Sequence, residues 1–416
     1  MLASRIIEEL WASGTHAISI TPAGSVRRSA PDVGDIALLG ITEPGRGDDF
    51  LTVSTRLPSV RRVVSRTATT VTLSTDRGDL SVHTAEPSSA GAALLCLTGS
   101  TGHVSVLTRL AQERGLRLGT GRLTDPLGVL VECRTESEVY GRLGLPFIPP
   151  ELRHGGDEIE AAFEGRLPAL LTDMHIRGDL HMHSTWSDGR DSIAAMVQAS
   201  QALGYEYIAI TDHSQSALSS RKMAADDVPQ QRTEITHIRR RYPRIQVLHG
   251  VEVDILKDGS LDFEDAVLEG FDIVLASLHD HAGHQADVLT ERCLRAIASP
   301  YVNVITHPAN RSPAASSGYD LDFDRIFAAA VQTGTALEID GAPGHLDMDG
   351  ALARRAVAAG VTVVVDSDCH RADALGRQMR FGVATARRGW LEPRHVLNTQ
   401  PVEQVREFVA RKRARG

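Results

Sequence analysis

The chain of 416 residues is poor in cysteine, in aromatic residues and in long apolar runs, and each shortage excludes a class of protein. Its four cysteines are scattered without a CxxC spacing, which argues against a disulfide framework and against a metal site built from thiolates. No apolar run reaches the roughly 18 residues that a membrane-spanning helix requires. The opening MLASRIIEELW has acidic residues where a secretion signal would have its apolar segment, so we expect a cytoplasmic protein.

Positive charge is also scarce, because the formal net charge is −9 with 17 histidines counted as neutral. A protein that grips DNA through many phosphate contacts is usually basic. Any binding of nucleic acid must therefore be local or assisted by bound metal cations. With only 4% aromatic residues, the core must be mainly aliphatic. The length indicates two or three domains rather than one.

The histidines are distributed unevenly, with five in residues 1–176 and twelve in residues 177–416. The second part alternates short β-branched runs with amphipathic helical segments, which is typical of parallel β-α-β units. Seven such runs favour an α/β barrel over an open sheet, with its chemistry at the C-terminal ends of the strands. The runs are RGDLHMHS, YEYIAITDHS, IQVLHGVEVDI, FDIVLASLHD, VNVITHP, TALEID and VTVVVDSDCH.

The first part predicts a smaller α+β region with an antiparallel sheet. Helices are expected over residues 3–13, 104–115 and 136–143, and the strand-like runs are IALLG, FLTVST, TVTLST and DLSVHTA. Residues 150–176 contain paired prolines, paired glycines and acidic residues, which indicates a linker that carries one short helix.

Imidazoles and carboxylates gather where the strands of the second part are expected to end. Side chains alternate along a strand, so His181 and His183 should point the same way, as should Asp368 and His370. In a barrel these groups converge on one rim. The predicted set is His181, His183, Asp188, His213, Glu252, His279, His307, Asp368 and His370.

Such a set predicts a metal centre, because several carboxylates held close together repel one another unless cations neutralise them. Six histidines and three carboxylates without thiolates suit Mn²⁺, Zn²⁺ or Fe²⁺ better than Ca²⁺ or Mg²⁺. Nine ligands are too many for one ion, so we expect three divalent ions with Glu252 bridging two of them. We expect His281 and His284 to be loop residues outside this set.

These motifs resemble those of the polymerase and histidinol phosphatase (PHP) superfamily, in the order HMHSTWSDG, TDHS, GVEVDI, SLHD, THP and DSDCH. The resemblance is closer to bacterial family X DNA polymerases with a C-terminal PHP domain, and it extends through LGLPFIPPELR, ARRGWL and VLNT. It implies a distorted (β/α)7 barrel over residues 177–416. Before it would come a degenerate polymerase palm-like region (1–88), a thumb-like region (89–149) and the linker (150–176).

The resemblance also implies a distribution of ligands over three ions and an activity. In the family pattern the first ion is held by His181, His183, Glu252 and Asp368, the second by Glu252, His279 and His307, and the third by Asp188, His213 and His370. The family's PHP domain is a manganese-dependent 3′–5′ exonuclease that also acts on blocked or abasic DNA ends. One departure from the pattern lies in EIDGAPGHLDM, where Asp340 and His345 stand at positions that more often hold Asn and Arg.

The first part resembles the palm and thumb of the same polymerases in decayed form. PAGSVRR is similar to the nucleotide-binding motif and implies a degenerate nucleotide site at Gly24, Ser25 and Arg28, and TGS at 98–100 lies in the thumb. The resemblance also implies that the N-terminal helical DNA-binding domains are lacking.

The metal-binding carboxylates of the palm are incomplete in this resemblance. VGDIALL stands at the family's GDxD motif, so Asp35 is kept and Ala37 replaces the second carboxylate, while Asp79 in GDLSV is expected to supply the third. Nucleotidyl transfer needs carboxylates that hold two Mg²⁺ ions across the transferring phosphate. We therefore expect polymerase activity to be lost.

The predicted function is metal-dependent phosphoester hydrolysis, most simply a 3′–5′ exonuclease that processes DNA 3′ ends in repair. A hydroxide bound between two ions would attack phosphorus, with Glu252 and His307 at the reacting centre. Arg311 and Arg292 are candidate clamps for the substrate phosphate. Two alternatives remain: a phosphomonoesterase for small phosphorylated substrates, of the histidinol-phosphatase type, and a non-catalytic DNA-repair adaptor.

Overall fold

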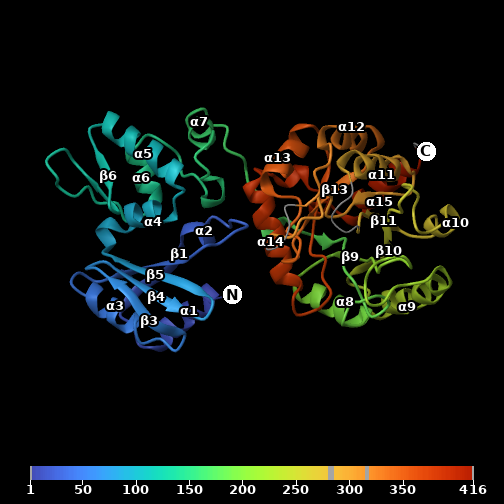
Figure 1. The fold of residues 1–416 in the computed structure, drawn as a ribbon, viewed down its shortest axis with the longest axis horizontal. Coiled ribbons are helices and arrows are strands. Elements are labelled where there is room, and N and C mark those ends of the chain that lie inside the picture. The colour runs from blue at the N-terminus through green and yellow to red at the C-terminus, as the bar shows by residue number, and fades with distance from the viewer. Residues whose placement is uncertain (1, 280–284, 314–317, 415–416) are drawn as a thin grey trace. The chain divides into compact units, whose positions relative to one another are not determined.

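The structure, a computed structural model, describes residues 2–279, 285–313 and 318–414. Two compact units, Met1–Leu167 and Pro168–Gly416, divide the chain inside the segment predicted as the linker (Figure 1). Within the described ranges, no helix combines the length and the apolar character needed to cross a membrane.

The N-terminal unit is built on a five-stranded sheet in the order β1-β2-β5-β4-β3. Strands β2 and β5 pair in parallel and the other neighbours are antiparallel, so the predicted antiparallel sheet is in fact mixed. The elements are α1 (Leu2–Ala12), β1 (Ala17–Ala23), α2 (Gly24–Arg27), β2 (Ile36–Thr42), α3 (Gly47–Ser54), β3 (Val60–Arg66), β4 (Thr70–Thr75), β5 (Gly78–Ala85), α4 (Ala90–Thr98), α5 (Thr101–Glu113), β6 (Arg117–Gly119), β7 (Arg122–Thr124), α6 (Glu136–Arg142) and α7 (Glu158–Phe163).

One predicted strand of this unit is a helix. The run FLTVST, residues 50–55, falls mostly in α3, so its assignment as a strand was wrong. Phe50, Leu51 and Ser54 are buried there, and their spacing places them on one side of a helix against the sheet. The acidic residues Asp48 and Asp49 lie in its first turn, where they interact favourably with the helix dipole.

The helical part of the unit is held by a buried ion-pair network. Arg153 is fully buried, and its Nη1 donates to Glu136 Oε1 at 2.6 Å. Arg27 Nη2 donates to the other carboxylate oxygen of Glu136, also at 2.6 Å. Burial by itself would raise the pKa of Glu136, but the two guanidinium groups outweigh it and lower that pKa.

The C-terminal unit is a barrel of parallel strands, as predicted, and each of the seven sequence runs contains one of them. In the described residues the strand order is β14-β13-β12-β11-β10-β9-β8. A parallel bridge between Met182 and Cys369 joins the two ends of this order, with the His183 N–H donating to the Cys369 carbonyl at 2.9 Å. The strands are β8 (Gly178–Asp179), β9 (Tyr207–Ile210), β10 (Gln246–Asp254), β11 (Ile273–Ser277), β12 (Val304–Ile305), β13 (Ala336–Asp340) and β14 (Val363–Asp366).

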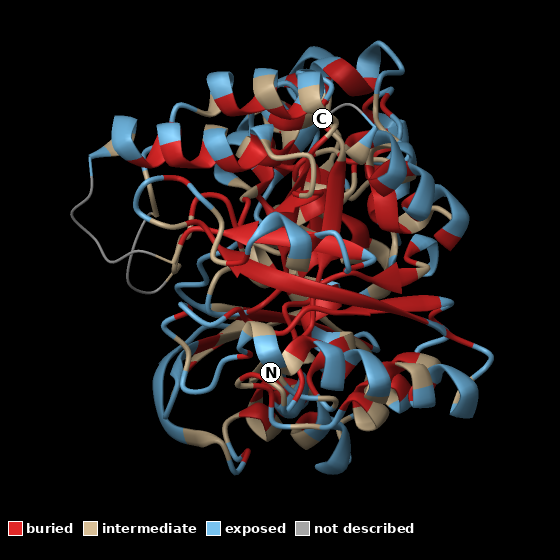
Figure 2. Ribbon diagram, turned by 90° about the vertical axis from the view of Figure 1, so that its right-hand side faces the viewer, coloured by how far each residue is buried: buried red, intermediate tan, exposed pale blue. Residues whose placement is uncertain are grey.

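Helices surround this barrel and close one end of it. The strands are almost entirely buried, whereas the helices keep exposed outer faces (Figure 2). Val405, Phe408 and Val409 of the last helix pack against strand residues such as Leu248 and Val364, which plugs the end opposite the strand C-termini. The helices are α8 (Ile193–Ala202), α9 (Val228–Arg241), α10 (Asp265–Leu268), α11 (Ala286–Ala298), α12 (Phe323–Thr333), α13 (Gly350–Ala358), α14 (Leu375–Arg388) and α15 (Val402–Arg413).

Candidate metal centre

The nine side chains predicted as ligands are brought together at the C-terminal ends of the barrel strands. Glu252, on β10, is 1% exposed and lies at their centre. Its Oε2 is 2.8 Å from His213 Nδ1, and its Oε1 is 3.1 Å from His307 Nε2 and 3.4 Å from His279 Nε2. A single carboxylate therefore faces imidazoles from three different strands, as the predicted bridging role requires.

A deep part of the cluster lies beside Glu252. His183 Nε2 is 3.2 Å from His181 Nε2 and 3.0 Å from Asp368 Oδ1. His181 Nε2 is also 3.4 Å from Glu252 Oε2. The two histidines, separated by one residue, thus point to the same place, and both side chains are fully buried.

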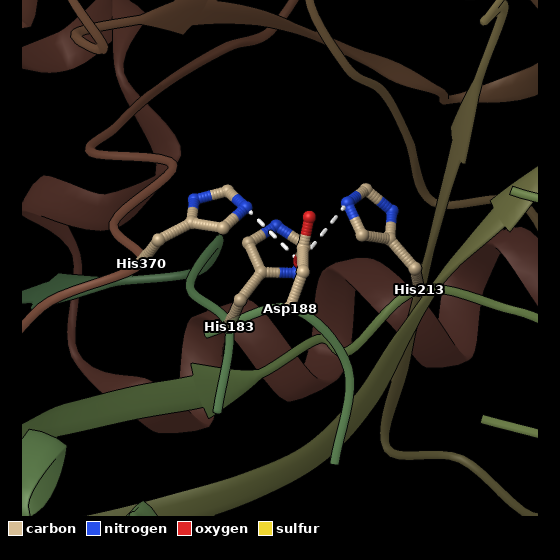
Figure 3. Close-up of side chains that lie close together, drawn as sticks. All are labelled: His183, Asp188, His213 and His370. Atoms are coloured by element: carbon tan, nitrogen blue, oxygen red, sulfur yellow. Dashed lines mark ion pairs between the residues drawn. The ribbon is translucent and has the colours of Figure 1, made fainter. Parts of the chain in front are cut away.

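A more exposed part of the cluster is centred on Asp188. Its Oδ1 is 3.2 Å from His370 Nε2 and 3.6 Å from His213 Nε2 (Figure 3). Ring atoms of His183 join this group, so that one ligand atom from each of the four residues lies within 4.8 Å of the others. His183 therefore stands between the deep part and this outer part.

The donor set fits divalent cations. Asp188 Oδ1, His213 Nδ1, Glu252 Oε2 and His307 Nδ1 are buried and have no hydrogen-bond partner among the residues that the structure describes. His213 Nδ1 and Glu252 Oε2 are only 2.8 Å apart, yet they do not form a hydrogen bond. Buried polar atoms are almost always satisfied, so converging atoms with unused lone pairs point to a bound ion.

Charge within the cluster prepares some ligands for a metal and leaves others protonated. Burial by itself would lower the pKa of His279 and of His370, but neighbouring carboxylates outweigh it and raise both to about 9, so these imidazoles must lose a proton when an ion binds. Burial, with the positive charges of His370 and His213, lowers the pKa of His183 to about 3, which keeps this imidazole neutral. Burial would raise the pKa of Asp188, but the neighbouring histidines outweigh it and lower that pKa to about 2. Burial is likewise outweighed at Glu252, whose pKa falls well below the usual range because His213, His181 and His279 surround it. An ionised carboxylate and a neutral imidazole are the forms that bind metals.

Two ligand residues adopt backbone conformations that side chains other than glycine rarely take. His307 has a φ of +25° and Asp368 a φ of +46°. Such conformations cost of order 1–3 kcal/mol and persist where the surrounding structure demands them, often at functional sites. Both residues turn away from their strands toward the shared cavity.

A second layer of carboxylates, which the sequence analysis missed, positions the histidines. Glu338 is fully buried, with its Oε1 2.7 Å from His181 Nδ1, and its Oε2 accepts the His307 N–H at 2.8 Å. Asp254 Oδ1 is 2.5 Å from His279 Nδ1. A carboxylate on the far nitrogen fixes the ring orientation and tautomer of a metal-binding histidine. The signal in the sequence was slight, because β10 and β13 each contain two acidic residues and the run itself does not show which of them supports a histidine.

The cluster opens into a cavity of about 330 Å³, which is lined by Asn310 and His345 as well as by ligand residues. Arg311 follows Asn310, and its guanidinium is 3.8 Å from the Asp349 carboxylate. Arg292 donates to the backbone carbonyls of Ile255 and Leu256, which favours a structural role over phosphate binding.

The two histidines expected in the loop after β11, His281 and His284, lie outside the described residues.

In the N-terminal unit, Gly24, Ser25 and Arg28 lie at and just after the short helix α2. The Ser25 hydroxyl is buried without a hydrogen-bond partner in the described residues. Arg28 donates to the Thr98 carbonyl and lines a pocket beside Gly99. Of the three predicted residues, Arg28 therefore contacts the TGS segment directly.

In the sheet of the N-terminal unit the predicted third carboxylate, Asp79, lies near the start of β5, one residue before Leu80. In the parallel pairing of β2 and β5, Ala37 lies opposite Ser81, one residue after the pair Ile36 and Leu80. All groups of three or more metal-binding side chains found among the described residues belong to the barrel. The palm-like region therefore lacks the clustered acids of a two-metal site.

Comparisons with known proteins agree with both units. A family model of the DNA polymerase beta thumb matches residues 93–154, and a model of the PHP domain matches residues 179–305. The barrel with its histidine- and carboxylate-lined rim is therefore a PHP domain, the hallmark of a class of metal-dependent phosphoesterases. The fold and the site define the chain as a hydrolase of that class.

The similarity to one relative extends over nearly the whole chain. The DNA polymerase/3'-5' exonuclease PolX of Bacillus subtilis (strain 168) is 36% identical over 413 residues, which cover 98% of this chain and 71% of the relative. The chain belongs to this family, the bacterial family X polymerases with a PHP domain.

Two further relatives match only part of the chain. A probable phosphatase of Thermoanaerobacter sp. (strain X514) is 30% identical over 179 residues, which cover 41% of this chain and 70% of the phosphatase. A structure of histidinol phosphate phosphatase from Lactococcus lactis, complexed with zinc, L-histidinol and phosphate, has a TM-score of 0.42 and 20% identity, and covers 51% of this chain and 94% of its own.

Proposed function

We propose that the chain is a manganese-dependent 3′–5′ exonuclease that processes DNA 3′ ends in repair. The observation that carries the proposal is the cluster of nine potential metal ligands, seven of which line one cavity, in a chain similar over 98% of its length to a polymerase/3'-5' exonuclease. The cavity, about 330 Å³, is at the small end of the roughly 300–1,000 Å³ range of ligand pockets. It suits one terminal nucleotide better than a length of duplex.

Three divalent ions, Mn²⁺, Zn²⁺ or Fe²⁺, are proposed to occupy the cluster. His181, His183, Glu252 and Asp368 would hold the first, Glu252, His279 and His307 the second, and Asp188, His213 and His370 the third. When bound, such ions offset the carboxylate charge, polarise the phosphate and lower the pKa of water toward roughly 7.

The residues of the chain contribute position and protonation state to this chemistry. We propose Glu252 and His307 as catalytic residues, because both face the cavity and lie 3.1 Å apart. His183 is neutral and Asp188 is ionised at physiological pH, which are the forms that bind an ion, whereas His279 and His370 would release a proton on binding. Arg311 is proposed to contact the substrate phosphate, since it follows Asn310, which lines the cavity, and its guanidinium is 3.8 Å from the Asp349 carboxylate.

We also propose that nucleotidyl transfer has been lost. Ala37 on β2 stands where the family pattern has the second carboxylate of a two-metal palm, so Asp35 and Asp79 would be the carboxylates that remain. Gly24, Ser25 and Arg28 would then form a degenerate nucleotide site that helps to hold DNA. A primer-extension assay with template, deoxynucleotides and Mg²⁺ should give no product, and extension would refute this part of the proposal.

The exonuclease is tested with 3′-labelled single-stranded DNA and Mn²⁺, from which mononucleotides should be released stepwise. His183→Ala should abolish release, while Glu291→Gln on the exposed face of α11 should leave it unchanged. Metal content is measured in each sample, because a metal-replete His183→Ala protein with full activity would show that the site is wrongly assigned.

One alternative has support of its own. The similarity of the barrel to a probable phosphatase, together with the small cavity, favours a phosphomonoesterase for small phosphorylated substrates. Turnover of histidinol phosphate or a nucleoside monophosphate, without release from DNA, would decide for it. A metal-loaded sample with neither activity would instead leave a non-catalytic adaptor.

We place the protein in the cytoplasm as part of the proposal, because its four cysteines are all unpaired and its proposed substrate is DNA.

A further inference from the structure

A pair of polar side chains beside the nine ligands has no role in the proposed function. Asp340 ends β13, and His345 lies in the loop that follows. One carboxylate oxygen of Asp340, one ring nitrogen of His345 and one carboxylate oxygen of Asp368 all lie within 4.8 Å of one another. Three ligand atoms from three separate residues therefore surround one point.

The atoms at this point are poorly satisfied. Asp340 is fully buried, and its Oδ1 accepts the Ala342 N–H at 2.6 Å. Its Oδ2 is buried and has no hydrogen-bond partner in the part of the chain that the structure describes, and the same is true of His345 Nδ1. A buried carboxylate oxygen without a donor is costly, so it points to a missing ligand.

The ring of His345 is held in place by stacking. It lies against the His307 ring, with centroids 4.8 Å apart and planes 17° from parallel. Both rings line the same cavity. An orientation fixed by packing lowers the entropy lost when the ring binds an ion.

We propose that Asp340, His345 and Asp368 form a further divalent-cation site, additional to the three ions of the proposed centre. Two carboxylates and one imidazole, without thiolates, suit Mn²⁺, Fe²⁺ or Zn²⁺. The site rests on the proposed function only through Asp368, which it shares with the first ion. An ion here would add positive charge to the wall of the cavity that His345 lines.

The site is tested by counting bound Mn²⁺ in the full chain. The protein is stripped of metal and dialysed against Mn²⁺. The bound ions are then counted by inductively coupled plasma mass spectrometry and by the loss of the electron paramagnetic resonance signal of free Mn²⁺. The variants are Asp340→Asn, His345→Phe and the double variant, with Glu291→Gln as the surface control. Asn has the shape of a protonated Asp, so Asp340→Asn tests for an ion at little risk to folding.

We expect Asp340→Asn and His345→Phe each to bind one ion fewer than the wild type, and the double variant to lose no more than one. Crystals soaked in Mn²⁺ should show an anomalous peak between Asp340 and His345. Equal counts in the wild type and both single variants would overturn the site.

A comparison with Asp188→Asn separates this site from the main centre. If Asp188→Asn loses bound Mn²⁺ and Asp340→Asn does not, the main centre stands and the further site falls. If the wild type binds no Mn²⁺, both are refuted.

Discussion

The second-layer residue Glu338 provides the most direct test of how the barrel prepares its ligands. Its two carboxylate oxygens serve two ligand residues at once, at 2.7 Å from His181 Nδ1 and 2.8 Å from the His307 N–H. Glutamine keeps the shape of the side chain but has one acceptor oxygen and no charge. In Glu338→Gln one of these two hydrogen bonds is therefore lost, and the other loses its charged acceptor.

The magnitude follows from the loss of one hydrogen bond to a charged acceptor, worth about 1.5–3 kcal/mol. Since about 1.4 kcal/mol corresponds to a factor of ten, Mn²⁺ should bind roughly 10- to 100-fold more weakly, the range seen for second-layer partners elsewhere. The folding stability of the metal-free protein should fall much less than its affinity for Mn²⁺. Glu338 raises the pKa of buried Asp340 and Asp366, after burial itself, so its removal relieves repulsion between carboxylates.

The assay is a Mn²⁺ titration followed by electron paramagnetic resonance, together with the rise in melting temperature that Mn²⁺ produces. Glu291→Gln serves as the control, because its carboxylate is exposed and pairs only with Arg325 at the surface. A Glu338→Gln protein that binds Mn²⁺ with wild-type affinity would refute the reasoning, since the orientation of His181 would then owe nothing to Glu338.

Three further results are expected. Asp254→Asn should weaken Mn²⁺ binding about tenfold by releasing the His279 ring, and an unchanged titration would contradict this. Removal of metal with a chelator should lower the midpoint temperature of only one calorimetric transition, that of the barrel unit. A fall in the midpoint temperature of both transitions would contradict this. Glu136→Gln should cost the N-terminal unit about 3–5 kcal/mol at pH 7, because it leaves Arg153 buried without an anion. The folded pKa of Glu136 lies below its ordinary 4.5, so this contribution is present above pH 4.5 and lost as pH falls through the folded value; urea unfolding of wild type and variant should therefore converge in acid.

The barrel could be predicted from the sequence because its strands are buried on both faces. Each strand appears as a short, nearly continuous apolar run. A polar side chain at the buried end of such a run indicates a binding or hydrogen-bonding role. Val363–Asp366 followed by Asp368 and His370 is such a case: the apolar strand gives way to ligands spaced by two. The spacing sets the face, and the barrel then brings together residues that are far apart in the chain.

The fold of the N-terminal unit was harder to predict, because its local sequence patterns are compatible with either a strand or a helix. The segment Phe50–Thr55 alternates like a strand, yet Phe50, Leu51 and Ser54 also form one side of a helix. Only the sheet against which they pack decides between the two. Strand β3 was not predicted, for the opposite reason. Nearly all its residues are exposed, so its sequence has no alternating apolar pattern that would indicate a strand.

The second layer could not be predicted because it depends on contacts between distant strands. Nothing near Glu338 in the sequence indicates that its partner is His181, 157 positions earlier. Alternation does place Glu338 and Asp340 on the same face of β13, but it does not say that one supports a histidine while the other has a free oxygen.

Two buried aspartates at the C-terminal end of β14, Asp366 and Asp368, have pKa values that are shifted in opposite directions. At the rim, burial opposes ionisation, but the imidazoles outweigh it and hold the pKa of Asp368 well below its usual range. Two residues earlier on β14, burial and the charge of Asp179 raise the pKa of Asp366 well above its usual range. Asp366 accepts the Leu180 N–H at 2.7 Å and helps to close the barrel without adding a charge. Of these two aspartates, Asp368 therefore carries the negative charge.

With the proposed ions bound, this arrangement would let an acidic chain attract the proposed phosphodiester substrate. The whole chain has a net charge of −9, which by itself would repel DNA. Three divalent ions in the proposed centre would carry more positive charge than Asp188, Glu252 and Asp368 can neutralise, while the histidine ligands are neutral when bound to metal. The cavity is then positive although its surroundings are not. Attraction for a phosphate would depend on the ions, so removing them should abolish substrate binding as well as hydrolysis.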